Sequence, residues 1–240
     1  MAGFKTHIGT SMTVGACYGG VGAYMGLPTE SCILASGICG IAGILPDLDS
    51  KSGVPVREMI AFSAAIVPAL MVDRFQHMQF SNERIVLVSA FIYVAIRYGV
   101  AELFKRYTVH RGMWHSIPAA ATMGCITFLV CSGEDHVVRL ILSAAAVLGF
   151  LTHLVLDEIW SIEFGRSGFR IKSSFGTALK FFGKGWWPNI STYGKLAVVV
   201  VLALGDPVMM DYFGFQENSF PDVARSFASE VIEQGKTMWR

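Results

Sequence analysis

The sequence contains little charge for its length. Only 15% of its 240 residues are Asp, Glu, Lys or Arg, whereas about 25% is usual for a soluble domain. Hydrophobic residues make up 53%, so a soluble fold of this size would lack the charge to cover its surface. A lipid bilayer removes that need, and we expect an integral membrane protein. The net charge of +1 and the lack of a basic tract indicate no nucleic-acid-binding surface.

Signatures of several other protein classes are also missing. The five cysteines are odd in number and none is spaced CxxC, which argues against a disulfide framework or a thiolate zinc site. There is no GxSxG motif of a serine hydrolase and no Pro-Ser-Gly-His motif of a phosphatidic-acid-type phosphatase. No convincing A-x-A cleavage site follows the first apolar run, so we interpret that run as a membrane span and not as a signal peptide.

Apolar runs recur along the chain and predict an all-α, polytopic membrane helical bundle with five to seven spans. Several runs are short, so tilted or re-entrant helices are expected among them. In the first run, Gly15 and Gly19 form a GxxxG pattern that lets helix backbones approach closely in lipid. The runs are Ile8 to Leu27, Ser31 to Leu45, Met59 to Val72, Ile85 to Val100, Ile117 to Cys131, Val137 to Leu156 and, more weakly, Leu196 to Met210.

The predicted organisation is a membrane-embedded domain over residues 1–213 and a C-terminal tail over residues 214–240. Within the domain, residues 160–193 mix aromatic rings with basic side chains, a composition that suits the lipid headgroup layer. We interpret this segment as interfacial, either as an anchor or as a flap that presents phosphate groups to a site. The tail has the pattern of a single amphipathic helix.

Four short polar clusters interrupt the apolar runs, and counting the spans places all four on one side of the membrane. They contain His7, then Asp47 with Asp49, then the segment from His110 to Ser116, and finally His153 with Asp157. Thirteen of the 19 Lys and Arg residues fall on that side, against three (Arg74, Arg84 and Arg139) in the opposite loops. Because positive charge is retained in the cytoplasm, the clusters are predicted to face the cytoplasm from the inner membrane.

The residue types in these clusters are those of a metal site. His153 and Asp157 are four residues apart on a helix and share one face, a frequent spacing for metal ligands. Asp47 and Asp49 would point to the same side if the backbone there is extended, and close carboxylates repel unless a cation separates them. Arg111, beside His110, would suit a phosphate because its planar guanidinium donates to two oxygens.

Together these residues predict one or two divalent ions at the membrane surface. Donors from His and Asp without thiolate favour zinc, with manganese as an alternative. Such an ion activates water for hydrolysis, and Asp49, His110 and Arg111 are the candidates for acid–base and phosphate-binding roles. The residues that could hold the ions are His7, Asp47, Asp49, His115, His153 and Asp157.

The motifs resemble the YdjM-type family of inner-membrane metal-dependent hydrolases. The resemblance rests on Thr6-His7, LPDLDS at 45–50, HRGMWHS at 110–116, HLVLD at 153–157 and KSSFGTALKF at 172–181, and covers roughly residues 5–185. That family is distantly similar to zinc-dependent phospholipase C and P1-type nucleases. The resemblance implies that five of these candidates are ligands, with Asp157 placed to bridge two ions: His7, Asp47, His115, His153 and Asp157. A second downstream His/Glu pair is missing from the sequence, so a trinuclear site is not expected.

The function expected from the sequence is hydrolysis of a phosphoester, with a membrane lipid as the first candidate substrate. The alternative from another class is a non-catalytic metal-binding or ion-transport protein, because ionisable residues in membranes often mark ion paths. The clusters lie at the ends of spans and not at their centres, which favours the enzyme. The sequence gives no indication of the oligomeric state.

Overall fold

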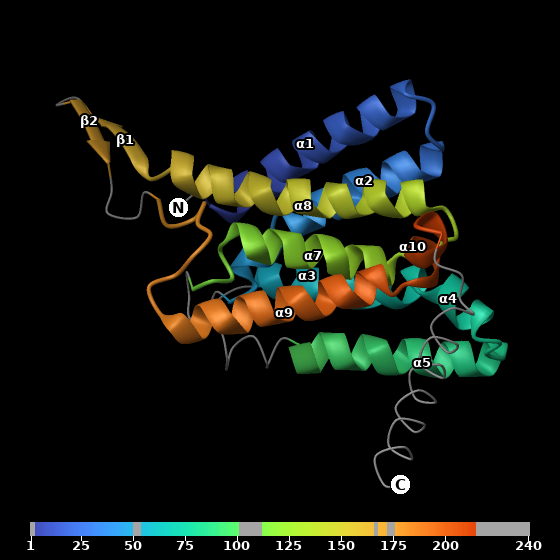
Figure 1. Cartoon of the computed structure of the whole chain (residues 1–240). Coiled ribbons are helices and arrows are strands. Elements are labelled where there is room, and N and C mark those ends of the chain that lie inside the picture. Colours follow the sequence, from blue (N-terminus) through green and yellow to red (C-terminus); the bar gives the residue numbers. More distant parts are fainter. Residues whose placement is uncertain (1–2, 50–53, 101–111, 166–167, 172–175, 215–240) are drawn as a thin grey trace, which may run out of the picture.

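The computed structural model describes residues 3–49, 54–100, 112–165, 168–171 and 176–214. Over these residues the fold is a bundle of helices with a small β-hairpin at one end (Figure 1). In chain order the helices are α1 (Phe4–Tyr24), α2 (Thr29–Ala42), the 3-10 helix η1 (Leu45–Asp49), α3 (Val54–Leu70), α4 (Val72–His77), α5 (Asn82–Val94), the π-helix η2 (Ala95–Val100), α7 (Ile117–Val130), α8 (His136–Ile159), α9 (Trp186–Leu204) and α10 (Pro207–Tyr212).

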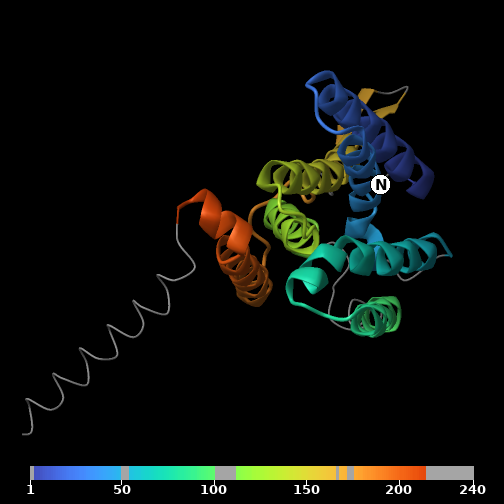
Figure 2. The same ribbon diagram turned by 90° about the vertical axis from the view of Figure 1, so that its right-hand side faces the viewer.

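Helix α8 is the centre of the bundle. It contacts α1, α2 and α7, while α9 packs on α7 and α5 packs on α3. The long helices lie roughly side by side in Figure 1, and Figure 2 views the bundle from a perpendicular direction. Two groups of buried apolar residues flank α8: one around Ala35, Cys39 and Leu142, the other around Phe150 and Leu154.

Glycines allow α1, α2 and α8 to pack backbone against backbone. A Cβ on Gly15 would lie 2.5 Å from the carbonyl oxygen of Ser36, and one on Gly19 would lie 2.6 Å from that of Cys32. A Cβ on Gly149 of α8 would overlap the carbonyl group of Cys39 on α2. The close approach expected from the GxxxG spacing in α1 is therefore confirmed, and α8 also packs closely on α2 at Cys39.

Three helical segments of the described chain are long and apolar enough to cross a membrane. They are Thr29–Asp47, His136–Ile159 and Trp186–Leu204, and Ile117–Val130 is a shorter apolar helix. Helix α1 has 21 residues, but its glycines and hydroxyl side chains lower its hydropathy. The prediction of five to seven spans needs at least two spans besides these three segments, and it stays a prediction.

The predicted runs agree with the observed helices to within a few residues, except for the last. The weak seventh run was expected from Leu196 to Met210, but α9 begins at Trp186 and ends at Leu204. Its early start is possible because Pro188 occupies the first turn, where a helix needs no N–H from it. The end is sharp because Asp206 accepts a hydrogen bond from Val208 N and starts α10.

Two local features were not predicted from the sequence. Residues 45–49 form the 3-10 helix η1 and not an extended segment, with Asp47 N donating to the carbonyl oxygen of Ile44 at 3.0 Å. The predicted all-α fold class is confirmed for the bundle, to which β1 (Ile162–Gly165) and β2 (Gly168–Ile171) add a short antiparallel hairpin within the segment expected to be interfacial. The last eight residues of that segment, 186–193, belong to α9.

Candidate metal centre

Five side chains from four parts of the chain converge at the end of the bundle where the chain begins. His7 lies in the second turn of α1, and Asp47 lies in η1. His115 precedes Ser116, whose side chain caps α7. His153 and Asp157 lie one turn apart near the end of α8. These are the five predicted ligands, and the structure brings all of them together.

The donor atoms lie close to one another in two overlapping triads. His7 Nε2 is 3.5 Å from Asp157 Oδ1, and His153 Nε2 is 3.8 Å from Asp157 Oδ2. His153 Nε2 is also 3.6 Å from Asp47 Oδ1, and His115 Nε2 is 3.9 Å from the same oxygen. His153 thus belongs to both triads, one with His7 and Asp157 and the other with Asp47 and His115.

These separations are too long for good hydrogen bonds but fit the spacing of ligands around an ion. An N–H···O bond has its heavy atoms at 2.7–3.2 Å. A zinc ion with donors at about 2.1 Å places neighbouring donors about 3.4 Å apart in a tetrahedral arrangement. The four measured separations run from 3.5 to 3.9 Å.

The carbonyl group of Gly43 orients His153. His153 Nδ1 is 2.8 Å from this oxygen at the end of α2, so Nδ1 carries the proton and Nε2 keeps its lone pair for the other side chains. The His7 ring stacks on His153 with centroids 3.8 Å apart and planes 15° apart. A carbonyl partner of this kind is the usual outer support of a metal-binding histidine.

The cluster is buried and rich in unused hydrogen-bonding groups. His7, His153 and Asp157 are no more than 3% exposed, whereas the Asp47 side chain is 22% exposed and marks the open side. His7 Nδ1, His153 Nε2 and Asp157 Oδ1 have no hydrogen-bond partner. Buried carboxylates and unpaired imidazole nitrogens are unfavourable unless something neutralises them, and a divalent cation does so. The donors present therefore fit a metal ion.

The three residues predicted for catalysis are not placed by the structure. Asp49 ends η1, but its side chain lies outside the described part of the chain. His110 and Arg111 lie outside the described residues as well. Their roles stay predictions.

Sequence reasoning missed Glu158, the neighbour of Asp157. Its buried carboxylate accepts hydrogen bonds from the backbone: Oε2 from Gly176 N at 2.8 Å, and Oε1 from Ala178 N at 2.8 Å and Leu179 N at 3.1 Å. It ties the segment after the hairpin to the end of α8. An acidic residue at the end of an apolar helix was the only signal for it.

Arg139 was placed wrongly. It was counted among the loop cations of the side opposite the clusters, but it lies inside α8 and is 1% exposed. Its guanidinium bonds to Asp206 at 2.7 and 2.9 Å, and Arg74 bonds to the same carboxylate at 2.6 Å. This ion-paired group lies at the other end of α8 from the histidines.

The helical spans and the buried His/Asp group define a membrane protein with a candidate metal centre at one end of its bundle. Residues 1–203 match the family of YdjM inner membrane proteins, and the chain belongs to that family. The resemblance seen in the motifs is thereby confirmed. Searches of curated proteins and of solved structures found no match, so the expected similarity to phospholipase C and P1-type nucleases stays an expectation.

Proposed function

We propose that this YdjM-family protein is a membrane-embedded, metal-dependent hydrolase that acts on a phosphoester at the cytoplasmic face of the inner membrane. The observation that supports it most is the convergence of five His and Asp side chains at 3.5–3.9 Å, with buried donor atoms that no hydrogen bond satisfies. Clusters of this type with perturbed or unsatisfied groups are characteristic of functional sites.

The ion is zinc or, as an alternative, manganese, because the donors are imidazole and carboxylate. One or two ions are proposed, as expected from the sequence. His153 Nε2 is common to both triads, and an imidazole nitrogen has a single lone pair, so it binds one ion only. Its Nδ1 is already engaged by Gly43. The two triads therefore cannot each use His153 for a separate ion, and each gathers three donors within 4.8 Å of one another.

A bound divalent ion would lower the pKa of a water molecule and polarise a phosphoryl oxygen. The protein would hold the ion through His7, Asp47, His115, His153 and Asp157, while Gly43 fixes the tautomer of His153. Asp49 and His110 are the proposed proton-transfer residues, and Arg111 is the proposed phosphate ligand. All three belong to the chain segments next to Asp47 and His115.

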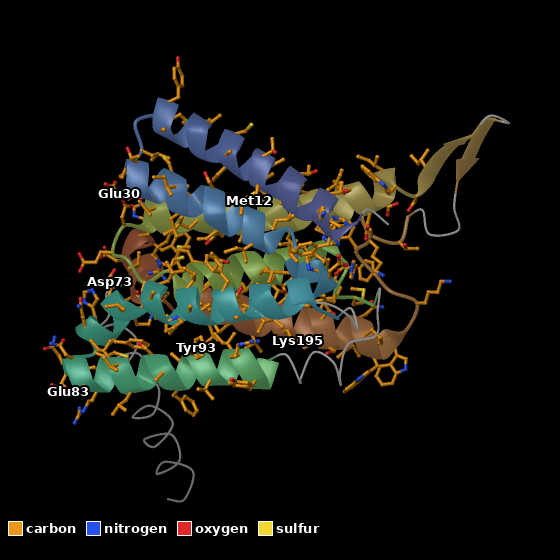
Figure 3. The ribbon with its side chains drawn as sticks, turned by 180° about the vertical axis from the view of Figure 1, so that it is seen from behind. Met12, Glu30, Asp73, Glu83, Tyr93 and Lys195 are labelled. Carbon is orange, nitrogen blue, oxygen red and sulfur yellow. The ribbon has the colours of Figure 1, made fainter. Side chains whose placement is uncertain are left out.

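The proposed topology has seven crossings, made by α1, α2, α3, α5 with η2, α7, α8 and α9. Consecutive helices then alternate in direction, and the candidate metal centre, the hairpin and the start of α9 share one end (Figure 1). The opposite end carries Glu30, Asp73 and Glu83 (Figure 3). Lys and Arg set the orientation of a membrane protein, and their excess on the site side in the sequence supports a cytoplasmic site.

Ion transport is the alternative, and the interior of α8 argues against it. Between Arg139 and His153, the buried face of α8 includes Leu142, Ala145, Ala146, Gly149 and Phe150. An ion path through the bilayer needs polar groups or water along its length. Along this described stretch of the central helix, the inward side is predominantly apolar.

An assay of phosphoester cleavage in reconstituted vesicles tests the proposal. Protein loaded with zinc or manganese is given phosphomonoesters and phosphodiesters, both soluble and lipid. We expect cleavage by the wild type and its loss in Asp157→Asn. The matched control is Asp135→Asn, an exposed aspartate that caps the other end of α8. Equal cleavage by Asp157→Asn, or none by metal-loaded wild type, would overturn the proposal.

A further inference from the structure

Residues 176–187, here called the strap, run past the candidate metal centre and are bonded to two of its elements. Glu158, next to Asp157, holds the backbone of Gly176, Ala178 and Leu179. Ile117, two residues after His115, donates its N–H to the carbonyl oxygen of Lys180 at 3.1 Å. The strap therefore lies at the same end of the bundle as the candidate site, and at the same depth along the helix axes.

The strap also packs inward and continues rigidly into α9. Ala178 is buried with Phe150 and Leu154 of α8. Gly183 N donates to Asn189 Oδ1 at 2.7 Å, and the Asn189 side chain donates back to the Gly183 carbonyl at 3.1 Å. Tyr193 Oη donates to the carbonyl oxygen of Phe181 at 3.0 Å. These bonds fix the position of the strap relative to both the site and a candidate membrane span.

The outward side of the strap consists of large aromatic rings. Phe181 and Phe182 are 57% and 70% exposed, and Trp186 and Trp187 are 73% and 66% exposed. Lys184 lies among them and is also exposed. Exposed tryptophans with an interleaved cation suit the boundary between headgroups and acyl chains, where one part of the indole ring is apolar and its N–H stays hydrated.

Lys195 limits how deep α9 can lie in the membrane, because its charged group must reach the headgroup layer. It is exposed near the middle of α9 (Figure 3), eight residues after Trp187, or about 12 Å along the helix. Side chains on a helix lean toward its N-terminus, so the aliphatic part of Lys195 runs toward the strap. A lysine within a span extends in this manner until its ammonium group reaches the membrane interface. Both features place the headgroup layer at the start of α9.

We propose that the strap docks on the headgroup layer of the bilayer and holds the metal centre at headgroup depth. If the proposed hydrolase function is correct, the substrate class follows: an amphiphile whose phosphoester lies in the headgroup layer while its apolar part stays in the membrane. The docking itself does not depend on metal or on catalysis.

Depth-dependent fluorescence quenching tests the docking. The protein is reconstituted into phosphatidylcholine vesicles whose acyl chains are brominated near the carbonyl end or near the methyl end. Subtracting the emission of Trp186→Phe/Trp187→Phe from that of the wild type isolates the strap tryptophans. The control is the same subtraction with Trp114→Phe, since Trp114 lies at the same end but is part-buried, with its Nε1 bonded to Leu45 O at 3.0 Å.

We expect strong quenching of the strap tryptophans by bromines near the carbonyl end, weaker quenching by bromines near the methyl end, and little quenching of Trp114 by either. Quenching by acrylamide in water without quenching by either lipid would overturn the proposal, as would quenching that is strongest near the methyl end. Phosphoester cleavage does not enter this measurement. The docking proposal can therefore fail while the hydrolase proposal stands, and the hydrolase proposal can fail while docking is observed.

Discussion

Arg139 and His153 lie on the same helix, about 21 Å apart at 1.5 Å per residue, and both are almost completely buried. At the Arg139 end, donors and acceptors are matched: its guanidinium bonds to both oxygens of Asp206 and to the carbonyl oxygen of Phe128, and it lies 4.1 Å from the Phe128 ring. At the His153 end, nitrogen and oxygen atoms of the five side chains face one another at 3.5–3.9 Å, and His7 Nδ1, His153 Nε2 and Asp157 Oδ1 have no hydrogen-bond partner.

The difference separates a structural ion pair from a candidate binding site. A buried charge is tolerated when its partners within the protein satisfy it, as Asp206 satisfies Arg139. A buried group that the protein leaves unsatisfied has an energetic reason to bind something else. The two ends of α8 should therefore respond in opposite ways to mutation and to metal.

The largest effect is expected from Asp206→Ala. It leaves Arg139 buried without its counter-ion, and the free energy of unfolding should fall by about 3–5 kcal/mol. Metal bound per folded chain should not change. His7→Ala should show the reverse: metal is lost, while the metal-free protein loses less stability than Asp206→Ala does, because removing one unsatisfied buried nitrogen partly offsets the cavity left by the ring. Unfolding in denaturant and metal analysis of both variants measure this.

The comparison fails if Asp206→Ala loses metal as completely as His7→Ala does while remaining folded. The two clusters would then act as one coupled system along α8.

Metal removal should give the next largest effect. A ligand at 100 times its Kd stabilises the folded state by about 2.7 kcal/mol, and a chelator removes that contribution. The thermal midpoint of the wild type should fall on chelation and recover with zinc or manganese. His153→Ala should show no response to either treatment. A chelator response of equal size in His153→Ala would place the ion elsewhere.

Gly149→Ala should destabilise the packing of α8 on α2 between the Arg139 and His153 ends. The added Cβ overlaps the Cys39 carbonyl group of α2, which is backbone and cannot rotate away, and overpacking of this kind costs about 1–3 kcal/mol. Gly37→Ala in α2 is the matched control, because its added Cβ has no atom within 4 Å and alanine favours the helix. The thermal midpoint should fall in Gly149→Ala and rise in Gly37→Ala. Equal shifts in the two variants would contradict the close packing.

The smallest effect is expected from acid at the Asp206 end. Burial acts to raise the pKa of Asp206, but hydrogen bonds and charge from Arg139 and Arg74 outweigh it and lower the pKa overall. A lowered pKa gives stability that is complete above the unfolded value of about 3.9 and is lost as the pH falls through the folded value. The stability difference between wild type and Asp206→Asn should stay constant from pH 7 to about pH 5 and shrink below about pH 4. A difference that shrinks between pH 7 and 5 would contradict this assignment.

Much of the site could be predicted because its residues follow the helix ends. Counting apolar runs was enough to sort His7, Asp47, His115, His153 and Asp157 to one end, since each crossing reverses direction. Arg139 could not be placed in this way, because its partner Asp206 is 67 residues away and nothing local indicates the pairing. The strap bonds of Glu158 depend in the same way on backbone groups 18–21 residues further along the chain.

The local backbone was harder to predict than the arrangement of helices. The 3-10 turn at 45–49 and the hairpin at 162–171 are short, and their sequences have no periodicity that separates them from loops. The start of α9 was missed because Trp186, Trp187 and Asn189 are typical of an interface and not of an apolar run. Tertiary contacts decide these segments more than their own sequence does.

The central claim is that the His/Asp cluster binds divalent metal, and the metal content of the detergent-purified protein tests it most directly. Wild type, His153→Ala and His77→Ala should be compared by elemental mass spectrometry after reconstitution with zinc or manganese. His77 is an exposed histidine paired with Glu134, away from the cluster, and serves as the control. The account predicts one or two equivalents in wild type and the same amount in His77→Ala, and none in His153→Ala. No metal in wild type, or the same amount in His153→Ala, would contradict it.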